Sequence, residues 1–400
     1  MPSLPVMRSL GLMWLTCWLL LTGACDGLFG EGQKVTADQQ QQLDIAAYNA
    51  TEQRLSAGRR EFASKKYSYQ QAVGNQLFFL DFPGFDPRLH RFDPATQTRL
   101  DYEFSIGSGE AFNFRASYAL VVTARKQGST VVYSAYEASA KNQLVGTTSF
   151  MAPSDAKWWA YAVSGEQVYV VTYDAMTQKT QLYQWSPRGT LAPKALFSLE
   201  AATGQPTLGI FLDFGVDGDT LVFIESGRIW KGSLASGRAT WLRNQVQIDG
   251  GNVDFQADGV TFSTAKGMFF FKNDTMQLWD VTQKISASPF QLSDTFKGSH
   301  RVSEGGFSRY GDYIVYIGGA GVFAYDLVRD DITPVLLEPR PDGPGQDPSS
   351  QPLRIEYRYP QVTTDGTLYV TGLTSTSGSV GADGPIYSVD LKPLLPIKSP

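Results

Sequence analysis

Cysteine and histidine are scarce in this chain of 400 residues, which holds two of each. The cysteines are Cys17 and Cys25, and the histidines are His90 and His300. No C-x-x-C, H-E-x-x-H or G-x-x-x-x-G-K-[ST] motif is present, so redox-cysteine, zinc-protease and P-loop nucleotide sites lack their first requirement. Two histidines are also too few for a histidine-based metal cluster. The sequence therefore predicts no catalytic residue and no metal ligand.

The N-terminus carries an apolar stretch that is too short to span a membrane. The run LGLMWLTCWLLL extends from Leu10 to Leu21, behind the positive charge of Arg8. A helix of that length measures about 18 Å, whereas the hydrocarbon core of a bilayer is about 30 Å thick. Small residues follow the run, as they do beside the cleavage point of a signal peptide. We expect residues 1–24 to be a signal peptide.

The residues at this cleavage point carry a more specific signal. The stretch TGAC, from Thr22 to Cys25, resembles the lipobox of bacterial lipoprotein precursors. That resemblance implies that the sulfur of Cys25 receives a diacylglycerol and that fatty acyl chains such as palmitate hold the protein in the inner or outer membrane of a bacterial cell envelope. Cleavage before Cys25 leaves one thiol in the mature chain, so no intramolecular disulfide forms. The alternative is an ordinary secretory signal that ends near a cysteine.

Charge and composition favour many short strands in a mildly acidic protein. The formal net charge is −5, which argues against nucleic acid as a partner, because phosphate binding requires clustered Lys and Arg. Aromatic residues make up 13% of the chain, which also contains 39 glycines. Aromatic strands separated by glycine-bearing turns are typical of all-β proteins.

A sequence pattern recurs seven times and predicts a repeat architecture. Its form is an apolar residue, two further residues, a usually aromatic residue, and then Asp, Glu or Ser. The intervals between its final residues are 44, 49, 47, 47, 46 and 64 residues, and a second strand-like run precedes each copy. Strands repeated at this period indicate a β-propeller, for which we predict seven blades. Six or eight blades and an irregular β-sandwich are the alternatives. The final residues are Asp93, Glu137, Ser186, Ser233, Asp280, Asp326 and Asp390.

Two repeats resemble those of quinoprotein-type propellers, which carry D-x-x-T-G-x-x-x-W. In SLASGRATW, Gly237 and Trp241 match this motif, and in FDPATQTRL Asp93 and Thr96 match while Gln97 stands at the glycine position. In that family the motif is a structural turn between two blade strands. QLWDV, around Asp280, also resembles the end of a WD repeat. A lipid anchor followed by such a propeller resembles the layout of the propeller lipoprotein of the outer-membrane barrel-assembly machine.

The segment between lipid and propeller is polar and rich in glutamine. We expect residues 25–72 to form a tether and residues 73–400 to form the propeller. Leu43, Ala47 and Ala50 share one face of a helix, so part of the tether is predicted to be helical.

Two further segments were considered as sites. DFGVDGD, from Asp213 to Asp219, holds three carboxylates, but its spacing differs from that of a calcium-binding EF-hand loop. A solvated turn is therefore favoured. Trp158 and Trp159 are adjacent, and adjacent strand residues point to opposite faces, so at least one of them is expected to pack between blades.

The sequence as a whole favours a non-catalytic platform that is anchored in the envelope and binds an envelope protein or a polymer, with no cofactor. The competing hypothesis is an envelope enzyme, either a glycan hydrolase or lyase or a dehydrogenase that holds a quinone cofactor and calcium at the propeller axis.

Overall fold

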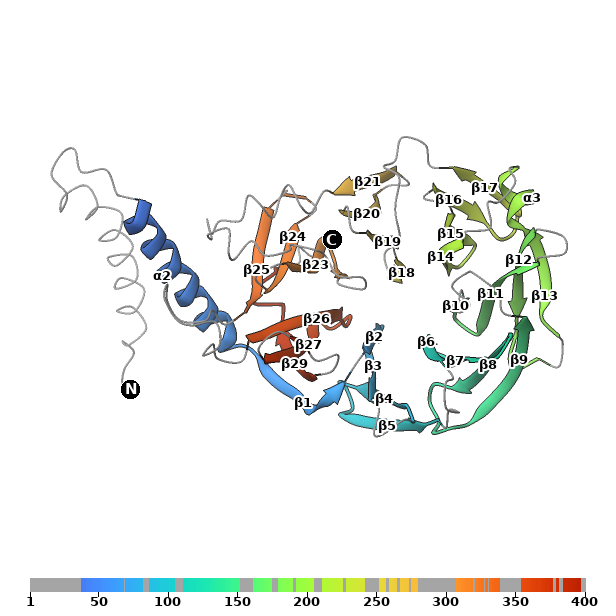
Figure 1. Cartoon of the computed structure of the whole chain (residues 1–400), viewed down its shortest axis with the longest axis horizontal. Helices are drawn as coiled ribbons and strands as arrows, with labels where there is room; N and C mark the ends of the chain where they lie inside the picture. Colours follow the sequence, from blue (N-terminus) through green and yellow to red (C-terminus); the bar gives the residue numbers. More distant parts are fainter. Residues whose placement is uncertain are drawn as a thin grey trace, which may run out of the picture.

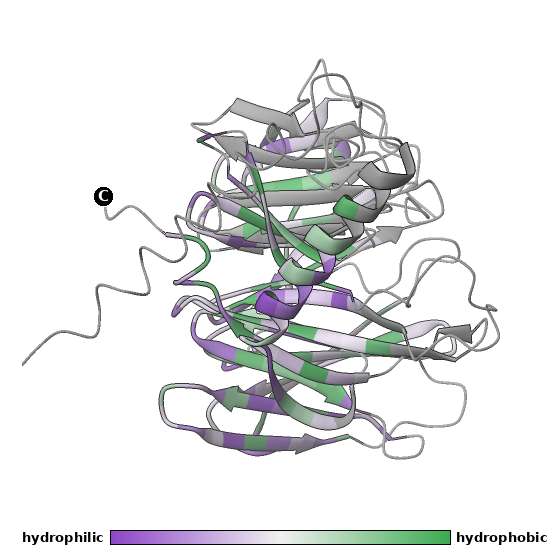
Figure 2. Cartoon of the chain, turned by 90° about the vertical axis from the view of Figure 1, so that its left-hand side faces the viewer, coloured by the Kyte–Doolittle hydropathy of each residue, from purple (hydrophilic) through white to green (hydrophobic). Residues whose placement is uncertain are grey.

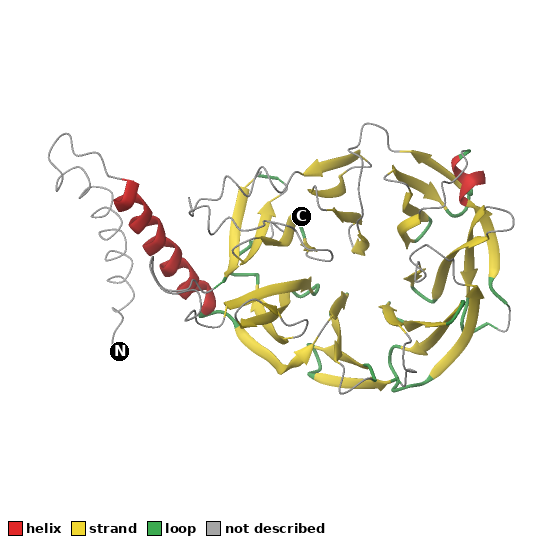
Figure 3. Cartoon of the chain, in the orientation of Figure 1, coloured by secondary structure: helices red, strands yellow, loops and turns green. Residues whose placement is uncertain are grey.

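The computed structural model shows an all-β chain folded as a ring of sheets (Figure 1). Almost all of the described elements are strands (Figure 3). The structure describes residues 37–396 outside these stretches: 68, 82–85, 105–110, 152–160, 175–178, 190–191, 205–210, 226–227, 242–251, 257–258, 265–266, 273–274, 280–306, 319–320, 327, 330, 339–353, 377–378 and 381–383.

The strands in this part of the chain form seven antiparallel sheets, whose first strands lie near the centre of the ring and whose last strands lie along its rim (Figure 1). The first three sheets, from the inner to the outer strand, contain β2 (Tyr69–Val73), β3 (Gln76–Asp81), β4 (Arg88–Asp93) and β5 (Thr98–Glu103); β6 (Ala111–Ala116), β7 (Leu120–Gln127), β8 (Thr130–Glu137) and β9 (Leu144–Met151); and β10 (Tyr161–Ser164), β11 (Gln167–Asp174), β12 (Lys179–Trp185) and β13 (Lys194–Ser198).

The next three sheets have the same order. They contain β14 (Phe211–Asp217), β15 (Thr220–Glu225), β16 (Arg228–Ser233) and β17 (Arg238–Trp241); β18 (Asn252–Gln256), β19 (Gly259–Thr264), β20 (Gly267–Lys272) and β21 (Thr275–Trp279); and β22 (Phe307–Tyr310), β23 (Tyr313–Gly318), β24 (Gly321–Asp326) and β25 (Asp331–Leu337). The short helix α3 (Leu199–Thr203) follows β13.

The seventh sheet joins the two ends of the described chain. It contains β26 (Arg354–Val362), β27 (Thr367–Thr376), β29 (Gly384–Asp390) and, as its outermost strand, β1 (Arg60–Tyr67), while the two-residue strand β28 (Ser379–Val380) pairs with β27. Strand β1 pairs antiparallel with β29, and Arg60 lies opposite Ser388. The ring is thus closed by a strand that lies within the predicted tether. The predicted boundary between residues 72 and 73 is therefore wrong, because sheet pairing begins at β1.

The recurring sequence pattern marks the third strand in six sheets, namely β4, β8, β12, β16, β24 and β29. In the fifth sheet the pattern lies on the fourth strand, β21, and the run GMFFFK forms the third. This shift by one strand arises because the fifth sheet begins with β18, a strand that the repeat pattern did not include. Strand β18 pairs with β19 on the inner side of the sheet.

The last residue of the pattern shapes the turn to the outer strand. Oδ1 of Asp93 accepts a hydrogen bond from the backbone N–H of Ala95 at 3.0 Å, and Oδ1 of Asp326 accepts one from Val328 at 2.8 Å. In the fourth sheet, Oγ of Ser233 accepts one from the N–H of Ser236 at 3.1 Å. Asp and Ser side chains commonly stabilise turns in this way. Asp93, Ser233 and Asp326 therefore have a structural role in their turns.

The glycine position of this turn requires a left-handed backbone. Gly237 has φ +61°, and Gln97, which takes its place in the first sheet, has φ +55°. A side chain in this region costs about 1–2 kcal/mol. We expect Gly237→Ala to lower the free energy of unfolding by about that amount and Gln97→Gly to raise it by about 0.5–1 kcal/mol, as measured by urea denaturation. Changes of equal sign in the two variants would contradict this assignment of the turn.

Helix α2 (Ala37–Ser56) lies outside the ring beside β25, and Figure 2 shows the side of the molecule that carries it. Tyr48 is fully buried, and its hydroxyl donates a hydrogen bond of 2.8 Å to the carbonyl oxygen of Glu338, just after β25. Leu55, seven residues on, is also buried, so the two lie on one face of the helix. The predicted apolar face is not the one that packs, because Leu43 is 53% exposed and Ala47 and Ala50 are exposed.

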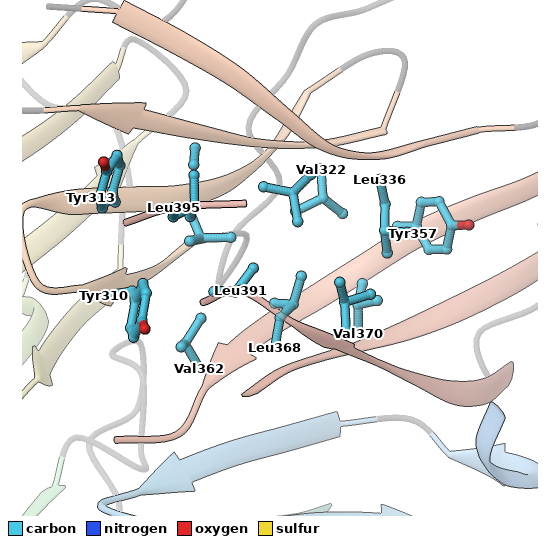
Figure 4. Packing of buried hydrophobic residues seen from close by; sticks show 14 of the residues in the cluster. Tyr310, Tyr313, Val322, Leu336, Tyr357, Val362, Leu368, Val370, Leu391 and Leu395 are labelled. Carbon is cyan, nitrogen blue, oxygen red and sulfur yellow. The ribbon is translucent and has the colours of Figure 1, made fainter. Parts of the chain in front are cut away.

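Apolar side chains fill the spaces between neighbouring sheets. Between the sixth and seventh sheets, the buried residues include Tyr310, Val322 and Leu336 on one side and Tyr357 and Leu368 on the other (Figure 4). Strand β24 is buried at every position, so both of its faces are covered, and its sequence is a nearly continuous apolar run.

Candidate interaction face of the propeller

An exposed tyrosine lies on the turn between β6 and β7. Tyr118 is 72% exposed, whereas many other tyrosines of the described chain are buried. Its neighbour Ser117 fixes the turn, because Oγ accepts hydrogen bonds from the N–H groups of Ala119 and Leu120 at 3.2 and 3.1 Å. The same hydroxyl donates to the carbonyl oxygen of Gly165 in the next sheet at 2.6 Å. Ser117 thus fixes the turn both to its own strand and to the next sheet, and Tyr118 extends from this fixed turn into solvent.

The tip of the tyrosine lies over the turn between β10 and β11. A Cβ atom built on Gly165 would lie 3.2 Å from the hydroxyl oxygen of Tyr118, and Gly165 has φ +58°. Both the close approach and the left-handed backbone therefore favour glycine here. The next residue, Glu166, has a side chain that is 53% exposed.

An arginine joins the second and third sheets beside this tyrosine. Arg188, on the turn after β12, donates from Nε and Nη2 to the two carboxylate oxygens of Glu137 at 3.0 and 2.7 Å. Its Nη1 contacts Glu166. The hydrogen bonds that Arg188 donates to Glu137 are the main reason why the pKa of Arg188 is raised, so the guanidinium stays charged. A forked pair of this kind fixes the orientation of the side chain.

These five residues, Tyr118, Glu137, Gly165, Glu166 and Arg188, are called the Tyr118 patch below. The patch contains an aromatic ring, one cation and two carboxylates, without a nucleophile and base within hydrogen-bonding distance. Tyrosine and arginine are enriched among the residues that dominate binding energy in protein interfaces. The arrangement therefore suits recognition of another molecule. The sequence analysis missed it, because the patch forms only where turns from two different sheets approach one another.

A second polar group surrounds the buried His90 where the first and last sheets meet. Nδ1 of His90 lies 2.7 Å from Oδ1 of Asp101, and Nε2 lies 3.2 Å from Oδ1 of Asp81. Nη2 of Arg99 lies 2.7 and 3.2 Å from the two ring nitrogens. The imidazole is fully buried and packs edge-on against Tyr67 of β1, with ring centroids 5.8 Å apart. The group thus lies where β1 closes the ring.

Burial is the largest effect on His90 and lowers the pKa of its imidazole; the positive charge of Arg99 also lowers it, while the hydrogen bond to Asp101 raises it. Burial raises the pKa of Asp101, but hydrogen bonds from His90 and Arg99 outweigh this, and the net shift is downward. The group therefore favours a neutral imidazole beside an ionised Asp101. The sequence analysis assigned no role to His90, although the hairpin that pairs Asp93 with Thr98 also places His90 opposite Asp101.

The structure separates the residues that were considered as sites. Asp213 and Asp217 lie in β14, and Asp219 lies in the following turn, where Oδ1 accepts a hydrogen bond of 2.7 Å from the N–H of Ala235. A hydrogen bond from Ser233 is the main cause of the lowered pKa of Asp219. This bonding agrees with the predicted turn. Among the described residues, no three His, Cys, Asp or Glu side chains lie close enough to hold a metal ion.

The predicted lipid attachment site and three other residues named in the sequence analysis lie outside the described residues. They are the lipid attachment site Cys25, the pair Trp158 and Trp159, and His300. Within the described chain, no helix has both the length and the hydropathy needed to cross a bilayer.

Comparisons with known proteins support the fold. No family model matches the chain. No curated protein matches it either. Among solved structures, the chain is similar to the β-propeller domain of Cps50 (Swd1) from Myceliophteria thermophila, with a TM-score of 0.51 and 12% identity over 83% of this chain and 99% of that domain. It also matches the computationally designed protein Ika8, with a TM-score of 0.43 and 12% identity over 83% of this chain and 98% of the other. The likeness to the Cps50 domain, together with the ring of four-stranded sheets, identifies the fold as a β-propeller.

Proposed function

We propose that this protein is a non-catalytic, lipid-anchored platform of the bacterial cell envelope, and that its seven sheets are the complete set of blades. The Tyr118 patch is the observation that carries the proposal, because it presents an aromatic side chain on a rigid turn beside a fixed arginine. Rigid aromatic groups lose little conformational entropy on binding and contribute large contact areas. The patch would engage another envelope protein.

Helix α2 supports the anchoring half of the proposal. It leads from the N-terminal segment to the rim of the propeller and is attached there by Tyr48 and Leu55. A helix of 20 residues is about 30 Å long. Lipid attached to Cys25 and a helical spacer would hold the propeller beside the membrane while leaving its turns accessible. Two or more acyl chains provide stable attachment where one is marginal.

The binding half is tested by Tyr118→Ala. We expect this variant to fold normally, because the side chain is exposed, and to lose most of the partner protein that the wild type recovers from crosslinked membranes. Val328→Ala is the matched control, since Val328 is 66% exposed on a turn of another sheet. Equal recovery by the wild type and Tyr118→Ala would contradict a binding role for the patch.

The anchoring half is tested separately by Cys25→Ser. We expect the wild type to incorporate a labelled fatty acid and to sediment with membranes, and the variant to lose the label. A wild type that carries no label, or a variant that keeps it, would show that Cys25 is not the lipid attachment site.

A further inference from the structure

The outer strands of the sheets differ in how they are protected from pairing with another chain. An outer strand has unpaired N–H and C=O groups along one edge, and charges, proline or a covering element normally prevent association there. Strand β1 carries Arg60 and Glu61, and β5 carries Arg99, Asp101 and Glu103. Strand β25 contains a proline and is covered by α2. Strands β13 and β17 each carry one charged residue, so five of the seven outer strands in the described chain have a charge, a proline or a covering helix, and β9 and the shorter β21 do not.

Strand β9 lacks these protections. Its eight residues, LVGTTSFM, include no charged residue and no proline. It is the last strand of the second sheet and lies along the rim (Figure 1). Among the described residues, no hydrogen bond joins its outward edge to another strand. A bulge between Gly146 and Leu144 interrupts this edge near its start, so the uninterrupted template for strand addition is residues 146–151.

The exposed side chains of β9 all lie on one face. A register shift between Ala135 and Tyr136 of β8 places Leu144 on the same face as Thr147, Ser149 and Met151. These are the four exposed residues of the strand. Leu144 is 55% exposed and Met151 is 67% exposed, so a large apolar side chain stands at each end of this face.

This pattern is self-complementary. If two copies of β9 pair antiparallel about Thr148, Thr147 of each copy faces Ser149 of the other, and the bulged residues Leu144 and Val145 of each lie opposite Met151 of the other. Both apolar side chains then leave water, and no charged residues of the two strands oppose one another. The same pairing of two β5 strands about Asp101 would bring two carboxylates together.

We propose that β9 is a homodimer interface, at which two copies of this chain join their second sheets edge to edge through antiparallel β9 strands. One strand pair buries less surface than the roughly 1,000 Å² that a stable interface requires, so the dimer is weak and forms reversibly with concentration. The proposal does not depend on the Tyr118 patch, whose residues lie on turns and at a strand end of the second and third sheets and not on β9.

Sedimentation equilibrium of the purified full chain tests the interface. We expect a concentration-dependent dimer for the wild type and a dissociation constant at least about tenfold higher for Thr147→Lys/Ser149→Lys, which opposes like charges across the two-fold axis. Thr98→Lys/Thr240→Lys is the matched control, because both threonines are exposed on other outer strands. A wild type that stays monomeric, or a dimer that is equally strong in the β9 variant, overturns the proposal.

The register is tested by crosslinking, in chains whose Cys17 and Cys25 are replaced by serine. We expect a mixture of Thr147→Cys and Ser149→Cys chains to form severalfold more disulfide-linked dimer on mild oxidation than either variant alone, because a disulfide joins residues directly opposite one another and not diagonal neighbours about 7–8 Å apart. Equal yields in the mixture and the single variants would overturn the antiparallel register. Crosslinking to a different protein in whole membranes, without a homodimer, would instead assign this edge to another partner and refute the proposal.

Discussion

Replacing Tyr67 by alanine is expected to lower the free energy of unfolding by about 3–5 kcal/mol, the cost of removing a large buried aromatic side chain. Tyr67 is 1% exposed in β1, and its ring lies 4.9 Å from that of Phe79 in nearly perpendicular orientation. Because it packs between the last and first sheets, its removal weakens the contact that closes the ring. Urea denaturation measures the loss, and hydrogen exchange of the β1 and β29 amides locates it.

Tyr118→Ala is the comparison for Tyr67→Ala, because it removes the same atoms from an exposed site. We expect it to change the free energy of unfolding by no more than about 0.5 kcal/mol. If the two variants are equally stable, β1 does not close the ring in solution.

The second large effect concerns pH. The pKa of His90 is lowered in the folded protein, so between that pKa and the ordinary value near 6.5 the unfolded chain binds more protons than the folded one. The contribution of neutral His90 to the free energy of unfolding is therefore fully present above about pH 6.5. It is lost as the pH falls below that value, by at most about 1.4 kcal/mol per pH unit. The lowered pKa of Asp101 adds a further loss at more acidic pH, below its ordinary value of 3.8.

His90→Gln isolates this contribution. We expect the variant to be less stable by about 1–3 kcal/mol at pH 7.5, because Asp101 and Arg99 lose a buried partner, and to depend less steeply on pH below 6.5. His300→Gln removes the other histidine and serves as the comparison. An identical slope in the wild type and His90→Gln, from denaturation curves at a series of pH values, would show that His90 does not carry the pH dependence.

The parts of the fold that could be predicted from sequence are those encoded locally. Apolar runs such as TLVFIE and the acidic or serine residue at the end of the next strand lie within one hairpin, so their spacing indicates both strands and turn. The left-handed position at Gln97 is also local, since it follows from comparison with Gly237. These features repeat because each sheet uses the same turn chemistry.

The closing strand could not be predicted in the same way. REFASKKY has charged residues at both ends and no strict alternation, and its partner β29 lies at the other end of the chain. Packing of α2 through Tyr48 depends on the surface of β25, which no helical pattern reveals. The Tyr118 patch likewise depends on the approach of two turns from different sheets.

The pairing of β1 with β29 also bears on the order in which the protein is made. A ribosome produces β1 before the other described strands and β29 after them, so β1 has no strand to pair with until β29 has been made. Contacts between residues so distant along a chain form slowly. An arrested or truncated chain that lacks β29 would therefore carry six paired sheets and an open seam, with the apolar faces beside Phe79 and Tyr67 exposed to water and to quality-control proteases.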